Sequence, residues 1–142
     1  MLLLEKIELV FNKTDVQELD ADISDLGDEL EYCELSADEV RKVVNCLLNH
    51  IKNYKEATIV ENILNSCLRI MNSHGIFSGF DLDCVSPCIG SLNNECLSYM
   101  LTFWGFSGEE KYRTLIESFL TRDGLEEDAR ESLLELDYGT NN

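Results

Sequence analysis

Basic side chains are scarce in this sequence. Its 142 residues include 11 Lys and Arg against 28 Asp and Glu, which gives a formal net charge of -17. Nucleic acids and anionic membranes both attract positively charged protein surfaces, so neither is an expected partner. The excess of carboxylates instead favours a basic protein as the partner.

Proline, glycine and long apolar runs are also scarce. A single Pro and 8 Gly argue against a long disordered tail and against a turn-rich β-sandwich. No stretch approaches the roughly 20 apolar residues that a membrane-spanning helix needs. The chain begins with an apolar run from Met1 to Leu4, but Glu5 and Lys6 interrupt it before it reaches the roughly 7–15 residues of a secretory signal. We therefore expect a cytoplasmic protein.

Side chains and motifs for catalysis are few. The two histidines of the sequence, His50 and His74, stand at expected helix ends, where the helix dipole favours a positive charge. The short patterns typical of serine hydrolases, zinc proteases, phosphate-binding loops and dinucleotide-binding folds do not occur. The sequence therefore predicts no enzymatic activity, no catalytic residue and no cofactor.

Cysteine is the one reactive residue type that is well represented, with six copies. Cysteines inside apolar helical patterns behave as small buried hydrophobes. Cys84, Cys88 and Cys96, with His74 upstream, could be drawn as a zinc site, but zinc sites of this kind usually show two short ligand pairs, whereas one loosely spaced pair is present here. We expect reduced thiols and no metal, while zinc or a redox pair at this set remains an alternative.

Apolar residues recur at helical spacing along nearly the whole chain, and strand-like alternation never extends beyond a few residues. Ser36 and Glu39 form a predicted helix-capping box, and Ser107 to Glu110 form a second. Residues 75–90 are expected to be one long irregular connection. The sequence thus predicts a single all-α domain of about six to seven helices, at residues 3–12, 16–30, 37–52, 56–73, 91–104, 109–121 and 125–136.

The predicted helices suggest consecutive antiparallel pairs, 37–52 with 56–73 and 91–104 with 109–121. A period of about 40 residues built from helix pairs is typical of α-solenoids. The segment 120–136 resembles the turn and second helix of a HEAT repeat, with Asp123 in the turn and Arg130 in the helix at matching positions. Ser107 and Gly108 precede the matching first helix, so the resemblance covers about 35 residues well and the middle helix pair only loosely. It does not extend to residues 1–34, and it implies a short HEAT-like α-solenoid. An irregular helical bundle is the alternative.

The domain is expected to comprise acidic N-terminal helices (1–35), stacked helix pairs (36–137) and a tail (138–142). Residues 1–40 carry a net charge of -11 and residues 81–142 carry -9, whereas residues 41–80 carry +3. The acidic N-terminal part does not match a twelve-residue calcium-binding loop, because no starting position places Gly at the sixth residue of the loop and Glu at the twelfth. This part is therefore either a solvated helix face or a surface that binds a partner.

The candidate partner-binding residues are mostly acidic. Tyr32 stands among the acids and is the predicted aromatic anchor, while Trp104 is expected in the core. The residues from the predicted helix 16–30 and the segment after it are Asp22, Asp25, Asp28, Glu29, Glu31, Tyr32 and Glu34. A second candidate patch lies in the expected loop and consists of Phe80, Asp81 and Asp83.

In size, acidity, cysteine content and helical-repeat character, the chain resembles the immunity proteins of bacterial contact-dependent growth inhibition and related polymorphic toxin systems. The resemblance is one of type. It implies a monomer that binds a cognate toxin domain, often a basic nuclease, and occludes its active site with carboxylates from Asp22 to Glu31 in place of substrate phosphates. A HEAT-like scaffold or adaptor that binds a larger protein assembly is the alternative.

Overall fold

The computed structural model describes residues 2–140, and every regular element in that range is a helix, which confirms the all-α prediction. The α-helices are α1 (Leu3–Phe11), α2 (Val16–Tyr32), α3 (Ala37–His50), α4 (Ala57–His74), α5 (Asn94–Ser107), α6 (Arg113–Glu117) and α7 (Glu126–Thr140). The 3-10 helices are η1 (Ile51–Asn53), η2 (Leu82–Ser91) and η3 (Glu110–Tyr112). Among these described helices, none combines the length and the apolar character that crossing a membrane requires.

Capping side chains determine where some helices begin and end. Ser36 and Glu39 form the predicted box of α3, since each side chain accepts a hydrogen bond from the backbone N–H of the other residue. The second predicted box, at Ser107, is wrong. Ser107 is the last residue of α5, and Gly108 ends that helix in the left-handed conformation with a φ of 67°. A glycine directly after an apolar helix favours such an ending, because it adopts positive φ without a steric penalty.

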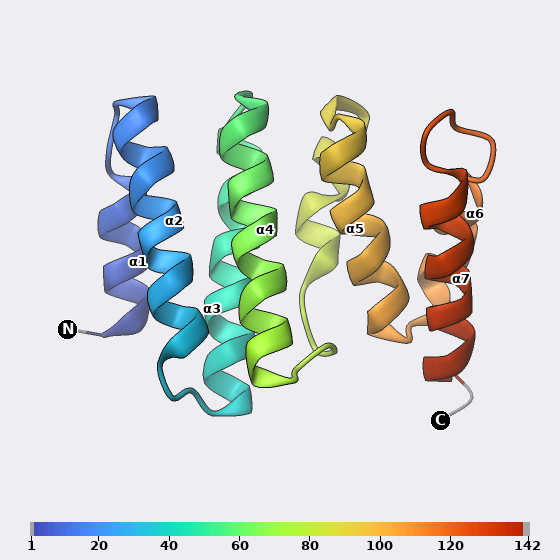
Figure 1. Cartoon of the computed structure of the whole chain (residues 1–142), viewed down its shortest axis with the longest axis horizontal. Coiled ribbons are helices and arrows are strands. Elements are labelled where there is room, and N and C mark those ends of the chain that lie inside the picture. Colours follow the sequence, from blue (N-terminus) through green and yellow to red (C-terminus); the bar gives the residue numbers. More distant parts are fainter. Residues whose placement is uncertain (1, 141–142) are drawn as a thin grey trace.

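The described chain folds into four consecutive pairs of elements that stack along the long axis of the molecule (Figure 1). α2, α4, α5 and α7 lie side by side in one layer, and α1, α3, η2 and α6 form a second layer behind it. The N-terminal and C-terminal ends therefore lie at opposite ends of the stack (Figure 1). This arrangement is compatible with a short α-solenoid, in which each pair buries its apolar side against its neighbours.

The pairs in the C-terminal half differ from the predicted ones. Most of the segment 75–90, expected to be irregular, is η2, which packs against α3, η1 and α5 through the buried Leu82 and Val85. η2 is thus the partner of α5, and α6 is the partner of α7. Leu82, Val85 and Ile89 do stand at helical spacing, but Pro87 lacks a backbone N–H and Gly90 follows, and both residues are typical of a loop. This explains why the packing role of η2 is hidden in the sequence.

The two ends of the chain also differ from expectation. α1 and α2 stack on α3 and α4 as the later pairs stack on one another, although residues 1–34 lack the HEAT resemblance. α7 continues to Thr140, so the predicted tail from residue 138 is helical as far as the structure describes it, and residues 141–142 lie outside the described range.

One continuous apolar core runs between the two layers, from Ile7 in α1 to Leu136 in α7. Trp104 is 1% exposed, as expected for a core residue, and its ring stacks on those of Tyr112 and Phe119 with centroids 6.3 and 6.0 Å away. The core takes up most large apolar side chains, while a few, such as Leu9, Tyr32 and Leu134, stay exposed on the surface.

Candidate functional site

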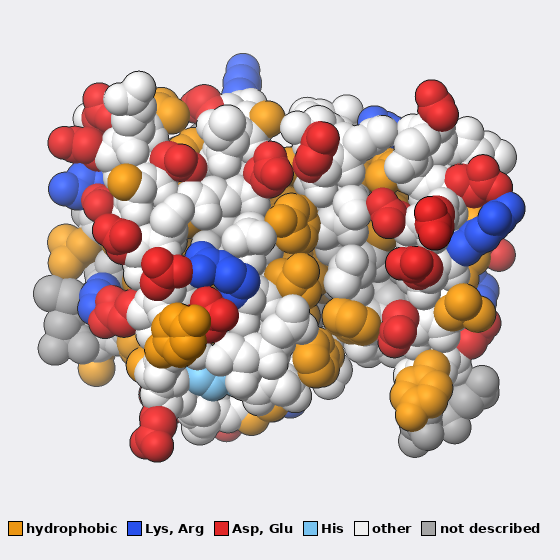
Figure 2. Space-filling model, viewed as in Figure 1, with side chains coloured by type: hydrophobic (Ala, Val, Ile, Leu, Met, Phe, Trp, Pro, Cys, Tyr) orange, Lys and Arg blue, Asp and Glu red, His pale blue; other side chains and the backbone are white. Residues whose placement is uncertain are grey.

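The predicted acidic residues of α2 lie along its solvent side. Asp22, Asp25, Glu29 and Tyr32 follow one another at helical spacing, so their side chains share one face of the helix. Asp22 is half-buried, and the others are exposed. Figure 2 shows acidic side chains gathered over the α1–α2 end of the stack and again over α7. We use the name α2 face for the predicted residues of α2 together with Glu34, which lies two residues past the end of the helix: Asp22, Asp25, Asp28, Glu29, Glu31, Tyr32 and Glu34.

Basic side chains of the same chain neutralise part of the α2 face. Arg69 of α4 pairs with Asp28 at 2.5 Å and with Glu31 at 3.2 Å. Other pairs join Lys6 to Glu29, and Lys13 to Asp22 at 3.8 Å. Within residues 2–140, Asp25 and Glu34 make no ion pair, so their charges remain available to a partner. The pairs of Lys6 and Lys13 are exposed, and such pairs contribute only about 0–1 kcal/mol each, so a basic partner can exchange them at little cost, whereas the Arg69–Glu31 pair is partly buried.

The two acidic ends of the stack differ in their relation to the helix dipole. α7 begins with Glu126, Glu127 and Asp128, where the positive end of the dipole stabilises carboxylates. The last turn of α2 contains Glu29 and Glu31 and no basic residue, although the negative end of the dipole disfavours acids there. The acids of α7 thus stabilise their own helix, whereas Glu29 and Glu31 are disfavoured by the dipole of α2 and are stabilised instead by Lys6 and Arg69.

A surface hollow of about 750 Å³ lies at this same end of α2. Three carboxylates, those of Glu31, Glu34 and Glu39, line it together with Tyr32, whose side chain is 83% exposed. His74 lines the hollow as well and donates from Nε2 to the Leu30 carbonyl oxygen at 2.8 Å, which ties the end of α4 to the end of α2. Its remaining lining residues are Cys33, Leu35, Ser36 and Ser73.

The second predicted patch is not assembled as expected. Phe80 is 8% exposed and belongs to the core, so it cannot serve as a surface anchor. Asp81 is exposed, but Asp83 pairs with Lys111 at 2.8 Å and accepts a hydrogen bond from the Tyr112 hydroxyl at 2.8 Å. These bonds lower the pKa of Asp83, the one from Lys111 most strongly. Asp83 therefore stabilises the packing of η2 against η3, at a distance from the α2 face along the stack.

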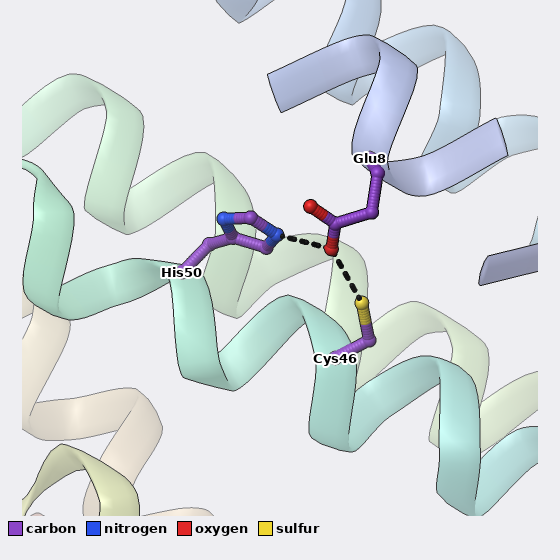
Figure 3. A group of neighbouring side chains, drawn as sticks. All are labelled: Glu8, Cys46 and His50. Carbon is purple, nitrogen blue, oxygen red and sulfur yellow. Dashed lines mark hydrogen bonds and ion pairs between the residues drawn. The ribbon is translucent and has the colours of Figure 1, made fainter. Parts of the chain in front are cut away.

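A cluster that the sequence analysis missed joins α1 to α3 (Figure 3). Glu8 Oε1 accepts from His50 Nε2 at 2.9 Å and from Cys46 Sγ at 3.5 Å. The His50 ring is stacked on Phe11, with centroids 3.9 Å apart and planes 4° from parallel. Cys46 and His50 are four residues apart on one helix, and this spacing is the signal that could have singled them out.

Hydrogen bonding and burial shift the pKa values of Glu8 and Cys46 in opposite directions. The bond from His50 holds the pKa of Glu8 below its usual value. Burial, with a further contribution from Glu8, raises the pKa of Cys46 to about 11. Cys46 is therefore a thiol at neutral pH, and the thiolate is the reactive form in nucleophilic catalysis. The His50 ring also faces Glu8 rather than forming the imidazole–thiolate pair of a cysteine nucleophile (Figure 3).

The cysteines considered as a zinc site do not come together. Among the described residues, Glu8, Cys46 and His50 form the one group of three or more potential ligands close enough to share an ion. Cys84 donates to the Asp81 carbonyl oxygen at 3.1 Å, while Cys96 is buried in α5. All six cysteines, which lie within the described range, are free thiols.

No protein-family model matches the chain, and neither a curated protein nor a solved structure does so.

Proposed function

We propose that this chain is an immunity protein that binds a cognate, basic nuclease-type toxin domain and neutralises it by occluding the toxin's active site with the α2 face. The acids at the end of α2 carry this proposal, because they lie where their own helix dipole disfavours them and beside the 83% exposed ring of Tyr32. Exposed acids beside an exposed aromatic ring are typical of a surface that attracts and anchors a basic partner.

The hollow at the end of α2 suits a cationic side chain. Its carboxylates, from Glu31, Glu34 and Glu39, can accept the parallel N–H bonds of a guanidinium group, and the Tyr32 ring offers a face for a cation. A nuclease positions Arg and Lys in its active site to hold substrate phosphates. An acidic surface seated on those residues excludes the nucleic acid by occupying the same charges.

The unpaired acids, the paired acids and the aromatic ring of the α2 face contribute differently to such a complex. Asp25 and Glu34, which are unpaired within residues 2–140, supply the long-range attraction that accelerates association. Asp28, Glu29 and Glu31 exchange their present partners for those of the toxin. Tyr32 provides the apolar area of a binding hot spot, because a large amphipathic ring can be buried while its hydroxyl stays hydrogen-bonded.

A charge-reversal experiment tests the proposal. The open reading frames beside this chain's gene are searched for one whose product is toxic to cells, and cells producing that product are supplied with the parent chain or with the double variant Asp25→Lys/Glu34→Lys. The variant is expected to lose protection. Its association rate constant with the purified toxin is expected to fall clearly, while its free energy of unfolding is expected to change little. Glu131→Lys/Glu135→Lys changes the same charge on exposed residues of α7 and is the matched control. Equal protection by both variants, each folded by circular dichroism, would contradict the proposal.

A scaffold or adaptor remains the second candidate, and the end helices favour it. Leu4 and Leu9 of α1 are 42% and 52% exposed, and Leu134 of α7 is 69% exposed. These side chains lie at the two ends of the stack, where further repeats of a longer solenoid would pack. Light scattering at increasing concentration separates the candidates, since an immunity protein is expected to remain monomeric and a solenoid fragment to self-associate.

A further inference from the structure

The Glu8, Cys46 and His50 side chains meet between α1 and α3, and we propose that they form a Zn²⁺ site with three protein ligands. The site is independent of the α2 face and of the proposed function. One carboxylate oxygen, one thiol sulfur and one imidazole nitrogen are brought within 4.8 Å of one another. This is the mixed oxygen, sulfur and nitrogen set that Zn²⁺ prefers among the common divalent ions.

The distances fit a tetrahedral ion. With Zn–S near 2.3 Å and Zn–N or Zn–O near 2.0–2.2 Å, ligand atoms of a tetrahedral site lie roughly 3.3–3.6 Å apart. The contact from Cys46 Sγ to Glu8 Oε1 is 3.5 Å, and that from His50 Nε2 to the same oxygen is 2.9 Å. A bound ion therefore requires the His50–Glu8 contact to open by a few tenths of an ångström, and it requires Cys46 Sγ and His50 Nε2, which lie within 4.8 Å of each other, to come to a similar separation.

The ligands are held by rigid elements. Cys46 and His50 project from the same side of α3, one helical turn apart, and Glu8 faces them from α1 (Figure 3). The Phe11 ring, stacked on His50, fixes the plane of the imidazole, and the half-buried position of Cys46 limits its rotamers. Preorganisation of this kind lowers the entropic cost of binding an ion.

The charges also match. The carboxylate of Glu8 and a thiolate of Cys46 together balance the two positive charges of Zn²⁺, with neutral His50 as third ligand. Binding releases the Cys46 thiol proton to solvent. The hydrogen that His50 Nε2 donates to Glu8 is also given up, and the neutral ring carries its proton on Nδ1, because the nitrogen that ligates the ion must be unprotonated. The two hydrogen bonds to Glu8 are thereby replaced with metal–ligand bonds. The Glu8 side chain is 57% exposed, so water can reach the fourth coordination position. A bound ion would link α1, the outermost helix of the stack, to α3.

Cobalt titration tests the site, because Co²⁺ occupies zinc sites and shows thiolate ligation by its near-ultraviolet charge-transfer absorption. The full chain, stripped with a chelator and kept reduced without added thiols, is titrated with Co²⁺ and then with Zn²⁺. One equivalent of Co²⁺ is expected to give the charge-transfer band together with tetrahedral visible bands, and Zn²⁺ is expected to abolish both. Absence of the band in the parent chain would overturn the proposal without reference to any variant.

Variants locate the ligands. Cys46→Ser is expected to abolish the band, while His50→Gln and Glu8→Gln are expected to weaken metal binding at least about tenfold, since even outer-shell changes cost 10–100-fold. Cys84→Ser and His74→Gln remove the same residue types elsewhere and are expected to leave binding unchanged. A band that survives Cys46→Ser or disappears in Cys84→Ser contradicts the assignment. Several weakly bound equivalents without a charge-transfer band, as surface carboxylates would give, also contradict it.

Discussion

Gly105 of α5 lies directly against Ser132 of α7. A Cβ atom added to Gly105 would fall 2.8 Å from the Ser132 carbonyl oxygen and 3.1 Å from its Cα. Ser132 is buried, at 3% exposure, and its hydroxyl donates to the Leu101 carbonyl oxygen at 2.6 Å across the same contact. The two helices thus approach closely because one has no side chain at this point, and this contact fixes the position of the last pair on the stack.

Gly105→Ala is expected to destabilise the protein. The added methyl group meets backbone atoms of α7 that cannot rotate away, and overpacking of this kind costs typically about 1–3 kcal/mol. The gain in helix propensity, about 1 kcal/mol, offsets only part of that cost. Urea denaturation followed by circular dichroism measures the change. Gly90→Ala is the control, because its added Cβ would meet no atom within 4 Å, and an equal loss of stability in the two variants would contradict this explanation.

Gly27 of α2 makes a similar contact with α4, but with softer neighbours. Its added Cβ would fall 2.5 Å from Arg69 Nη2 and 2.7 Å from Ser66 Oγ, and that buried hydroxyl has no hydrogen-bond partner. Gly27→Ala is expected to displace Arg69 from Asp28 and to destabilise the protein by about 1 kcal/mol. Ser66→Ala removes an unsatisfied buried group and is expected to be neutral or stabilising.

A double-mutant cycle checks this interpretation. Combining Gly27→Ala with Ser66→Ala removes one of the two clashing atoms, so the combined loss of unfolding free energy should be smaller than the sum of the separate changes. Strictly additive effects in urea denaturation would show that Ser66 does not limit the space at Gly27.

The fold class and several helix ends could be predicted because they depend on local patterns. The apolar periods identify α2 to α5, and the Ser36–Glu39 capping box begins α3 as expected. η2 was not predicted, since Pro87 and the nearby glycines indicated a loop, and the packing of Leu82 and Val85 against α3 depends on the tertiary structure. The close contacts at Gly27 and Gly105 were equally hidden, because in a single sequence a glycine within a helix signals only lower propensity.

The candidate sites also differ in how far local sequence spacing could predict them. The acids of α2 lie within one helix, so sequence spacing placed them on a common face, whereas their pairing with Arg69 comes from a helix about 40 residues away. Phe80 does lie in an irregular segment, before η2, but it was misplaced because it packs into the core instead of pointing to solvent. Glu8, Cys46 and His50 belong to two helices, and only the packing of α1 on α3 brings the carboxylate to the other two side chains.

Asp83 is expected to make stability depend on pH on the acid side. The bonds from Lys111 and Tyr112 lower its pKa in the folded state, so its contribution is present above its unfolded pKa of about 3.9 and is lost as pH falls through the folded value. Asp83→Asn should lower the free energy of unfolding at pH 7 by less than about 1 kcal/mol, because the side chain is 57% exposed. The difference from the parent should shrink below about pH 4.

Asp81→Asn is the control for this measurement. It removes a charge from the same segment, but Asp81 makes no ion pair within the described residues. Its effect at pH 7 is expected to be smaller than that of Asp83→Asn. A difference between parent and Asp83→Asn that persists unchanged to pH 3 would contradict the role given to the Asp83 carboxylate.

The cysteines are expected to differ in reactivity. Cys67 and Cys96 are 0% and 1% exposed, and burial raises the pKa of both thiols, to about 11 for Cys96. Their alkylation by iodoacetamide at pH 7.5 therefore requires unfolding or local opening of the helices that contain them. Mass spectrometry of the native protein should find these two labelled last and Cys33 and Cys88, which are only half-buried, labelled earlier. Uniform labelling of all four would contradict the packing of α4 and α5.

Tyr32→Ala is expected to separate binding from folding. The ring is 83% exposed, so its removal should leave the urea midpoint nearly unchanged, whereas loss of a hot-spot residue costs about 2 kcal/mol or more, which is roughly a 30-fold rise in Kd for the toxin domain. Tyr138→Ala removes the same ring from a 71% exposed position on α7 and is expected to leave Kd unchanged. Calorimetry with the purified toxin domain measures both, and equal Kd values for the two variants would place the binding surface away from the end of α2.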